Sequence, residues 1–104
     1  MKDMLILGKT PEGRDVYAGV FYLHDTLGLP AGMTAMILWD DFNGVVAWEQ
    51  FARDAFRAGW KEKKIISVIK EALIDFHPQS AKMIKPLVAR VEGQEKRRRF
   101  FDKL

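Results

Sequence analysis

The sequence predicts an all-α fold, a compact single domain of five or six short helices. Apolar residues recur at spacings of three and four along most of the chain, and glycine and proline separate these segments. The chain has 104 residues, of which 48% are hydrophobic and 30% charged, which suits one core of ordinary composition. We expect residues 1–104 to form one helical domain, with an N-terminal arm over 1–13 and a basic helical tail over 92–104.

The first expected elements are an apolar arm, a turn and a helix. Residues 1–9 form the arm, and 10–13, of sequence Thr-Pro-Glu-Gly, form the turn. A helix over 15–27 begins at a capping aspartate and carries valine and leucine at helical spacing. Gly28 suits the left-handed position that follows a helix, and Pro30 cannot continue one.

A second helix is expected over 31–42. Met33, Met36 and Ile37 form its apolar face, the face by which a helix packs onto a core. Asn43-Gly44 then makes a turn. This dipeptide is also a hairpin signal, but no alternating strands flank it, which favours the end of a helix.

Three more helical segments complete the expected fold, over 46–58, 60–76 and 80–91. Gly59 separates the first two, and His77-Pro78 ends the second because a residue before proline avoids the helical region. The last segment contains Pro86, so it is either kinked there or begins there.

The composition removes several classes of function. Cysteine is absent, which excludes disulfides, thiol chemistry and zinc fingers and fits a reducing cytoplasm. The two histidines, His24 and His77, lie on separate segments, so we expect no metal and no cofactor. No apolar run approaches the ~20 residues of a membrane span, and no glycine-rich phosphate loop is visible. We therefore expect a cytoplasmic protein that is not an enzyme.

Charge is unevenly placed along the chain. Residues 1–52 hold three basic and seven acidic side chains, whereas residues 53–104 hold fourteen basic and seven acidic ones. A bipolar surface on a globular domain is the plain interpretation. The sharper one is that the second half faces an anionic partner, which would be RNA, DNA or an acidic protein surface.

The basic half contains a spacing that resembles the helix-turn-helix motif, made by Ala55, Gly59, Ile65 and Val68. In that interpretation 61–70 is the recognition helix, whose candidate binding residues are Lys61, Lys63, Lys64 and Ser67. An ordinary helical hairpin needs the same small and aliphatic residues. The segment also lacks the Arg, Asn and Gln side chains that read bases through paired hydrogen bonds.

The tail combines basic and aromatic residues, and its candidate binding residues are Arg97, Arg98, Arg99, Phe100 and Phe101. Such a combination suits phosphate contact together with base stacking. Glu92–Lys96 and Glu95–Arg99 have the spacing of ion pairs on a helix. The alternatives are a solvated helix end whose aromatics pack on the body, and a homodimer contact through Phe100, Phe101 and Leu104.

The phrase Phe-Tyr-Leu-His-Asp-Thr-Leu-Gly-Leu-Pro at 21–30 resembles a segment of alanyl-tRNA synthetases, in the helical tRNA-recognition part of that family. The resemblance covers roughly residues 13–60. His24 replaces the family's tyrosine, and Leu27 and Leu29 replace aromatics. Catalytic and editing motifs are absent. The resemblance implies a helical scaffold and contact with structured RNA, and small proteins with this phrase look like those of bacteriophages.

Within this phrase we expect a structural clasp made by Asp25, Thr26, Gly28 and Pro30. The Asp and Thr side chains can bond backbone groups that are left free where one helix ends and the next begins. His24-Asp25-Thr26 looks like a catalytic fragment, but neighbouring helical residues do not face each other. We therefore expect no catalytic residue here.

These features favour a small, non-enzymatic, phage-type accessory protein. It would bind structured RNA or a host protein through its basic C-terminal half, with inhibition of a host system as one outcome. The alternative is a helix-turn-helix transcriptional regulator that binds DNA.

Overall fold

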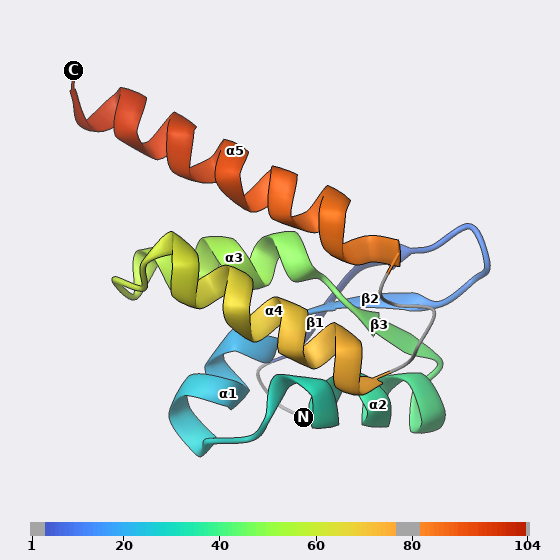
Figure 1. Cartoon of the computed structure of the whole chain (residues 1–104). Coiled ribbons are helices and arrows are strands. Elements are labelled where there is room, and N and C mark those ends of the chain that lie inside the picture. Colours follow the sequence, from blue (N-terminus) through green and yellow to red (C-terminus); the bar gives the residue numbers. More distant parts are fainter. Residues whose placement is uncertain (1–3, 77–81, 104) are drawn as a thin grey trace.

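Three strands and five α-helices make up the computed structural model, which describes residues 4–76 and 82–103 (Figure 1). In chain order the elements are β1 (Leu5–Lys9), β2 (Asp15–Ala18), α1 (Val20–Leu27), α2 (Ala31–Asp41), β3 (Gly44–Val46), α3 (Trp48–Arg57), α4 (Glu62–Phe76) and α5 (Ile84–Asp102). The expectation of an all-α fold is therefore wrong, because the chain is a small α/β domain with a mixed sheet.

The sheet joins the N-terminal arm to a segment beyond two helices. Its order is β1-β2-β3, with β1 antiparallel and β3 parallel to β2. The turn expected over 10–13 is confirmed, since the Gly13 N–H donates to the Thr10 carbonyl at 2.9 Å, but it joins two strands. α1 and α2 form the crossover that a parallel pair of strands requires.

Gly19 explains why β2 is a strand and not the start of the first helix. Its φ of 101° is incompatible with a helix, so the apolar spacing from Val16 to Val20 does not lie on one helical face. Val16 and Tyr17 are β-branched and aromatic residues, which favour a strand. β3 is also rich in valine and pairs along β2.

The bounds of three later helices agree with those expected from the sequence. α2, α3 and α4 begin and end within two residues of the expected positions. Gly28 is confirmed at the end of α1, with a φ of 70° and its N–H bonded to the His24 carbonyl. Pro86 lies in the first turn of α5, where its missing N–H costs no helical hydrogen bond. His77, Pro78, Ser80 and Leu104 lie outside the described residues.

α5 is a single helix through both the expected fifth segment and the basic tail. Its second half extends away from the body, on the opposite side of the molecule from α2 (Figure 1). Across the part of the chain that the structure describes, no helix combines the length and the apolar character that crossing a membrane requires.

Aromatic rings from three elements meet in the core. The Phe21 ring on α1 lies edge-on to Phe51 on α3 and to Trp60 in the turn after α3, with centroid distances of 5.5 Å and 5.1 Å. Phe51 also contacts Trp48 edge-on at 5.5 Å. Such edge-on pairs stabilise a core beyond the area that they bury.

α2 buries a different face from the expected one. Its buried residues are Ala31, Thr34, Ala35 and Leu38. Met33, Met36 and Ile37, which were expected to face the core, are 47%, 45% and 40% exposed. Both sets lie at helical spacing, so periodicity alone does not choose between them. The face with two alanines packs inward because it lets α2 lie close to α4 and β3.

Gly44→Ala should lower the free energy of unfolding by about 1–3 kcal/mol, the usual cost of overpacking. A Cβ on Gly44 would lie 2.5 Å from Tyr17 Cε2 and 3.3 Å from the Asp15 carbonyl oxygen, on the neighbouring strand. Gly8→Ala in β1 is the matched control, because a Cβ there meets no atom within 4 Å. Urea unfolding of both variants measures the difference, and equal stability of the two would contradict the tight β2–β3 contact.

Candidate functional site

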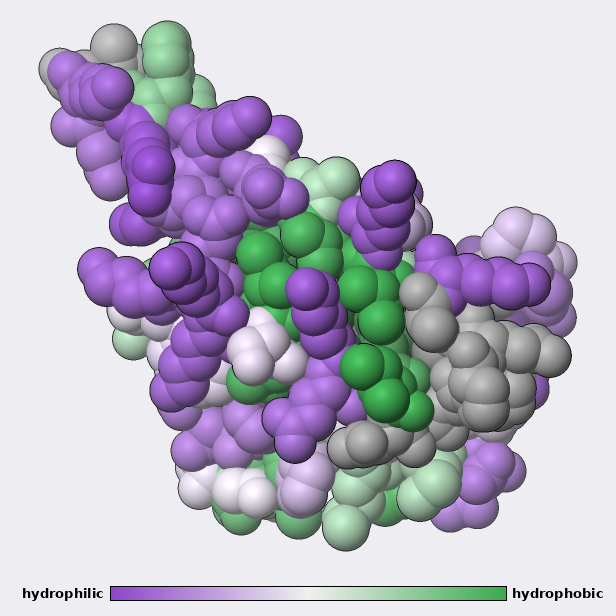
Figure 2. Space-filling model, in the orientation of Figure 1, coloured by the Kyte–Doolittle hydropathy of each residue, from purple (hydrophilic) through white to green (hydrophobic). Residues whose placement is uncertain are grey.

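The two basic segments expected to bind a partner lie at the same end of the molecule. In Figure 1 the second half of α5 lies above the C-terminal end of α3 and the turn that leads into α4, and it diverges from them toward its own end. Arg98 marks the contact, with its guanidinium carbon 5.5 Å from the centroid of the Phe56 ring. We define the basic end as the exposed cations here: Arg57, Lys61, Lys63, Lys64, Lys96, Arg97, Arg98 and Arg99. Figure 2 shows that the left of the view, including most of the projecting part of α5, is covered mainly by hydrophilic residues.

The turn between α3 and α4 has the features that the helix-turn-helix spacing predicts. Ala55 and Ile65 are fully buried, and Gly59 adopts a φ of 91° that glycine favours. The candidate residues on this segment are all exposed: Lys61, Lys63, Lys64 and Ser67. α3 and α4 run in opposite directions in Figure 1, which also fits an ordinary helical hairpin.

Lys64 differs from the other two lysines of this segment. Its Nζ lies 3.9 Å from the centroid of the Trp60 ring, so its charge rests on an aromatic face. Lys61 and Lys63 make no ion pair with any residue within 4–76 or 82–103. They are therefore the cations of this segment most available to an anionic partner.

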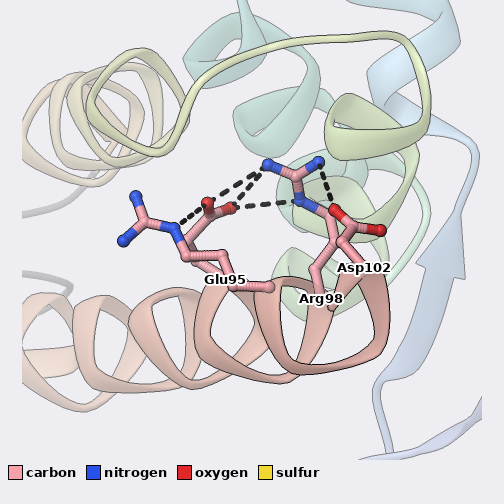
Figure 3. Close-up of polar contacts among 4 residues, drawn as sticks. Glu95, Arg98 and Asp102 are labelled. Atoms are coloured by element: carbon pink, nitrogen blue, oxygen red, sulfur yellow. Dashed lines mark hydrogen bonds and ion pairs between the residues drawn. The ribbon is translucent and has the colours of Figure 1, made fainter. Parts of the chain in front are cut away.

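Two arginines of the tail bind an internal carboxylate. Arg99 Nε donates to Glu95 Oε1 at 2.8 Å, and Arg98 Nη2 donates to the same carboxylate at 3.1 Å (Figure 3). Arg98 also lies 3.9 Å from Asp102. The Glu95 side chain is only 7% exposed. The expected Glu95–Arg99 pair is thus confirmed. It neutralises part of the positive charge that was expected to bind a partner.

Burial and arginine act in opposite directions on Glu95. Desolvation raises the pKa of the carboxyl group, while hydrogen bonds and charge from Arg99 and Arg98 lower it. The arginines prevail, and the pKa lies below its ordinary value of 4.5. Because the folded pKa is lowered, the ionised carboxylate stabilises the fold above that ordinary value, and the contribution is lost as the pH falls through the folded pKa.

Glu95→Gln should destabilise the protein at neutral pH and much less in acid. The charged hydrogen bonds are absent from the variant at every pH, whereas the native chain loses them only below pH 4.5. Thermal unfolding from pH 7 to pH 3 tests this, with Glu92→Gln, an exposed change on the same helix, as control. A gap between Glu95→Gln and the native chain that stays constant with pH would contradict the assigned role.

The last two turns of α5, residues 96–102, remain open to a partner, and we call them the tip of α5. Phe100 and Phe101 are 61% and 65% exposed, with their rings edge-on at 5.5 Å. The alternative in which these aromatics pack on the body is therefore wrong. Lys96 and Arg97 make no ion pair with the residues that the structure describes. The tip thus offers two cations and two aromatic rings.

α5 is joined to the start of α3 by polar contacts that the sequence did not indicate. Arg90 pairs with Glu49 at 2.6 Å, and the Gln94 amide donates to the Glu49 carbonyl at 3.2 Å. Beside them lies a shallow depression of about 380 Å³, lined by Glu49, Ala89, Arg90, Gly93, Gln94 and Arg97. Gln94 Oε1 is buried and has no partner among the described residues. These contacts fix the direction in which the tip points.

The connection between α1 and α2 is closed by His24. Its Nδ1 lies 2.9 Å from the Leu29 carbonyl oxygen, and since a carbonyl only accepts, Nδ1 carries the proton. Asp25 and Thr26, expected to form the clasp, are exposed, and no side chain caps the start of α2. Gly28 and Pro30 occupy the end of α1 and the position before α2, as expected. The hydrogen bond that closes this loop thus comes from the residue before Asp25.

Within residues 4–76 and 82–103, no three His, Asp or Glu side chains gather as a metal site would require. Comparisons with protein-family models, curated proteins and solved structures give no match for this chain. What the synthetase-like phrase implies therefore stays a prediction.

Proposed function

We propose that this protein is a non-enzymatic binder of structured RNA and that the basic end is its binding surface. One observation supports this most strongly: Arg98 of α5 contacts Phe56 of α3, which brings the basic stretch of α5, with its exposed Phe100 and Phe101, to the end of α3 that leads into the lysines of α4. Lys61 and Lys63 contribute from the α3–α4 segment, and Lys96 and Arg97 from α5. The sequence resemblance over 21–30 to a tRNA-recognition segment points the same way.

The aromatic pair favours RNA with unpaired bases over an acidic protein or a regular duplex. Bases in loops and bulges are free to stack on aromatic side chains, whereas paired bases are already stacked on each other. Phe100 and Phe101 present ring faces and edges at the tip of a helix, next to cations that suit phosphate. We infer that phosphates lie along the lysines and that unpaired bases contact the tip.

A helix-turn-helix regulator is the second candidate. The buried Ala55 and Ile65 and the left-handed Gly59 favour it. In that role the lysines of α4 would lie along the major groove of DNA, and two copies would bind half-sites about one helical turn apart.

Fluorescence polarisation with three labelled probes tests the proposal: an RNA hairpin with an unpaired loop, the same stem fully paired, and a DNA duplex of the same sequence. We expect the hairpin to bind most tightly, with log affinity falling linearly against log salt. Preference for one DNA sequence by a dimer would replace the proposal with the regulator. Equal affinity for all three probes, or binding that salt does not weaken, would contradict it.

A further inference from the structure

The outward face of α2 is apolar. Met33, Met36 and Ile37 lie on it, and all three are well exposed. We call these three residues the α2 patch. In Figure 2 hydrophobic residues appear along the edge of the molecule where α2 lies. A surface helix normally turns polar residues outward, so an outward apolar face indicates a contact with another molecule. Methionine suits such a contact because its side chain adapts to the surface that it meets.

The charge beside the α2 patch is negative. Asp40 and Asp41 are exposed in the last turn of α2, which contains no basic residue. The C-terminal end of a helix carries partial negative charge, so two aspartates there are unfavourable without a cation. Arg14 supplies one, by donating to the Trp39 carbonyl at 3.1 Å. Neither aspartate is in an ion pair with a described residue. A partner for this face should therefore be apolar and basic.

The tip of α5 has that chemistry. It carries exposed Phe100 and Phe101, and the exposed Lys96 and Arg97 precede them by one helical turn. The tip points away from the body on the opposite side from α2, so it cannot reach α2 of its own chain (Figure 1). We propose that the α2 patch binds the tip of α5 from a second copy of this protein. The aromatic rings would contact the methionines, and the tip's cations would lie near the two aspartates.

This contact joins two different surfaces, so it is head to tail. A pair of copies keeps one unused patch and one unused tip, and association therefore builds chains instead of closed dimers unless a ring closes. The proposal does not depend on RNA binding. Where both occur, RNA and the α2 patch compete for the same tip, so RNA should shorten the assemblies.

Two variants separate the surfaces. Met36→Lys with Ile37→Lys places cations on the patch, and Phe100→Asp with Phe101→Asp places acid on the tip. All four positions are exposed, so the fold should survive, which circular dichroism checks. Leu5→Lys, an exposed leucine on β1, is the control for added surface charge. All proteins are treated with nuclease, which removes RNA that could bridge copies.

Sedimentation equilibrium then gives the answer. For the native chain and for Leu5→Lys, we expect the average mass to rise with concentration and to fall with added salt. Each double variant alone should stay at the chain mass of 12.0 kDa. An equal mixture of the two double variants should form dimers and nothing larger, because it contains one intact patch and one intact tip.

Two results would overturn the proposal: a native chain that remains monomeric up to about 1 mM, where even weak association is visible, and a variant mixture that stays monomeric while the native chain associates. Binding of labelled RNA by the patch variant is measured separately. That variant keeps the basic end, so loss of self-association with native RNA affinity would concern the α2 patch alone.

Discussion

Changing Lys61, Lys63 and Lys96 together to Glu should weaken RNA binding on the order of 100-fold near physiological salt. Each lysine that contacts a phosphate releases counterions, and each contact contributes about 0.7 to the slope of log affinity against log salt for single strands. The three changes should therefore lower that slope by about 2. These lysines are exposed and make no ion pair within the described residues, so stability should barely change.

The control has the same net charge. Lys70, Lys82 and Lys85 are exposed lysines outside the basic end, and changing them to Glu alters the total charge equally. If position decides, this control keeps most of the affinity. Equal losses in the two triple variants would mean that RNA responds only to overall charge, and the basic end would not be a site. Arg98 and Arg99 are left unchanged because acids there would repel the buried Glu95.

Phe21→Ala should lower the free energy of unfolding by about 3–5 kcal/mol, the usual cost of removing a buried aromatic ring. Phe21 is fully buried and contacts both Phe51 and Trp60 edge-on. Its removal leaves a cavity where α1, α3 and the turn after α3 meet. Since a domain is stable by only ~5–15 kcal/mol, a large part of the stability should be lost. Urea unfolding measures the change.

Phe100→Ala is the matched control for this second change. The same side chain is removed, but from an exposed position at the tip of α5, so the stability should change by less than about 0.5 kcal/mol. Its affinity for the RNA hairpin should fall by about 1–3 kcal/mol of stacking, whereas Phe21→Ala should retain native affinity while folded. A destabilised Phe100→Ala with native RNA affinity would show that the tip is structural.

Features that depend on near neighbours could be predicted from the sequence. The turn at 10–13, the glycine after α1 and the bounds of α2, α3 and α4 follow from capping, turn geometry and breaks within a few residues. The Glu95–Arg99 pair belongs to the same class, because its spacing is one helical turn. The uneven distribution of charge along the chain also follows from the sequence alone.

The sheet could not be predicted in this way. β2 and β3 are four and three residues long, too short to show alternation, and they pair across two helices. The signal that could have separated β2 from α1 was Gly19, which interrupts an apolar spacing that otherwise resembles a helix.

The candidate binding surfaces also combine features that the sequence determines with features that only the tertiary structure determines. Which residues are basic or aromatic, and where α2, α3 and α4 begin and end, followed from the order of residues, because charge and local backbone preference belong to a residue and its neighbours. The fold alone decided that α2 buries Ala35 and exposes Met36, that Glu95 is covered and holds two arginines, and that Arg98 of α5 contacts Phe56 of α3. Those outcomes depend on which segments, distant in sequence, pack against each residue in the folded chain. The spacing of residues within one helix does not determine those tertiary contacts.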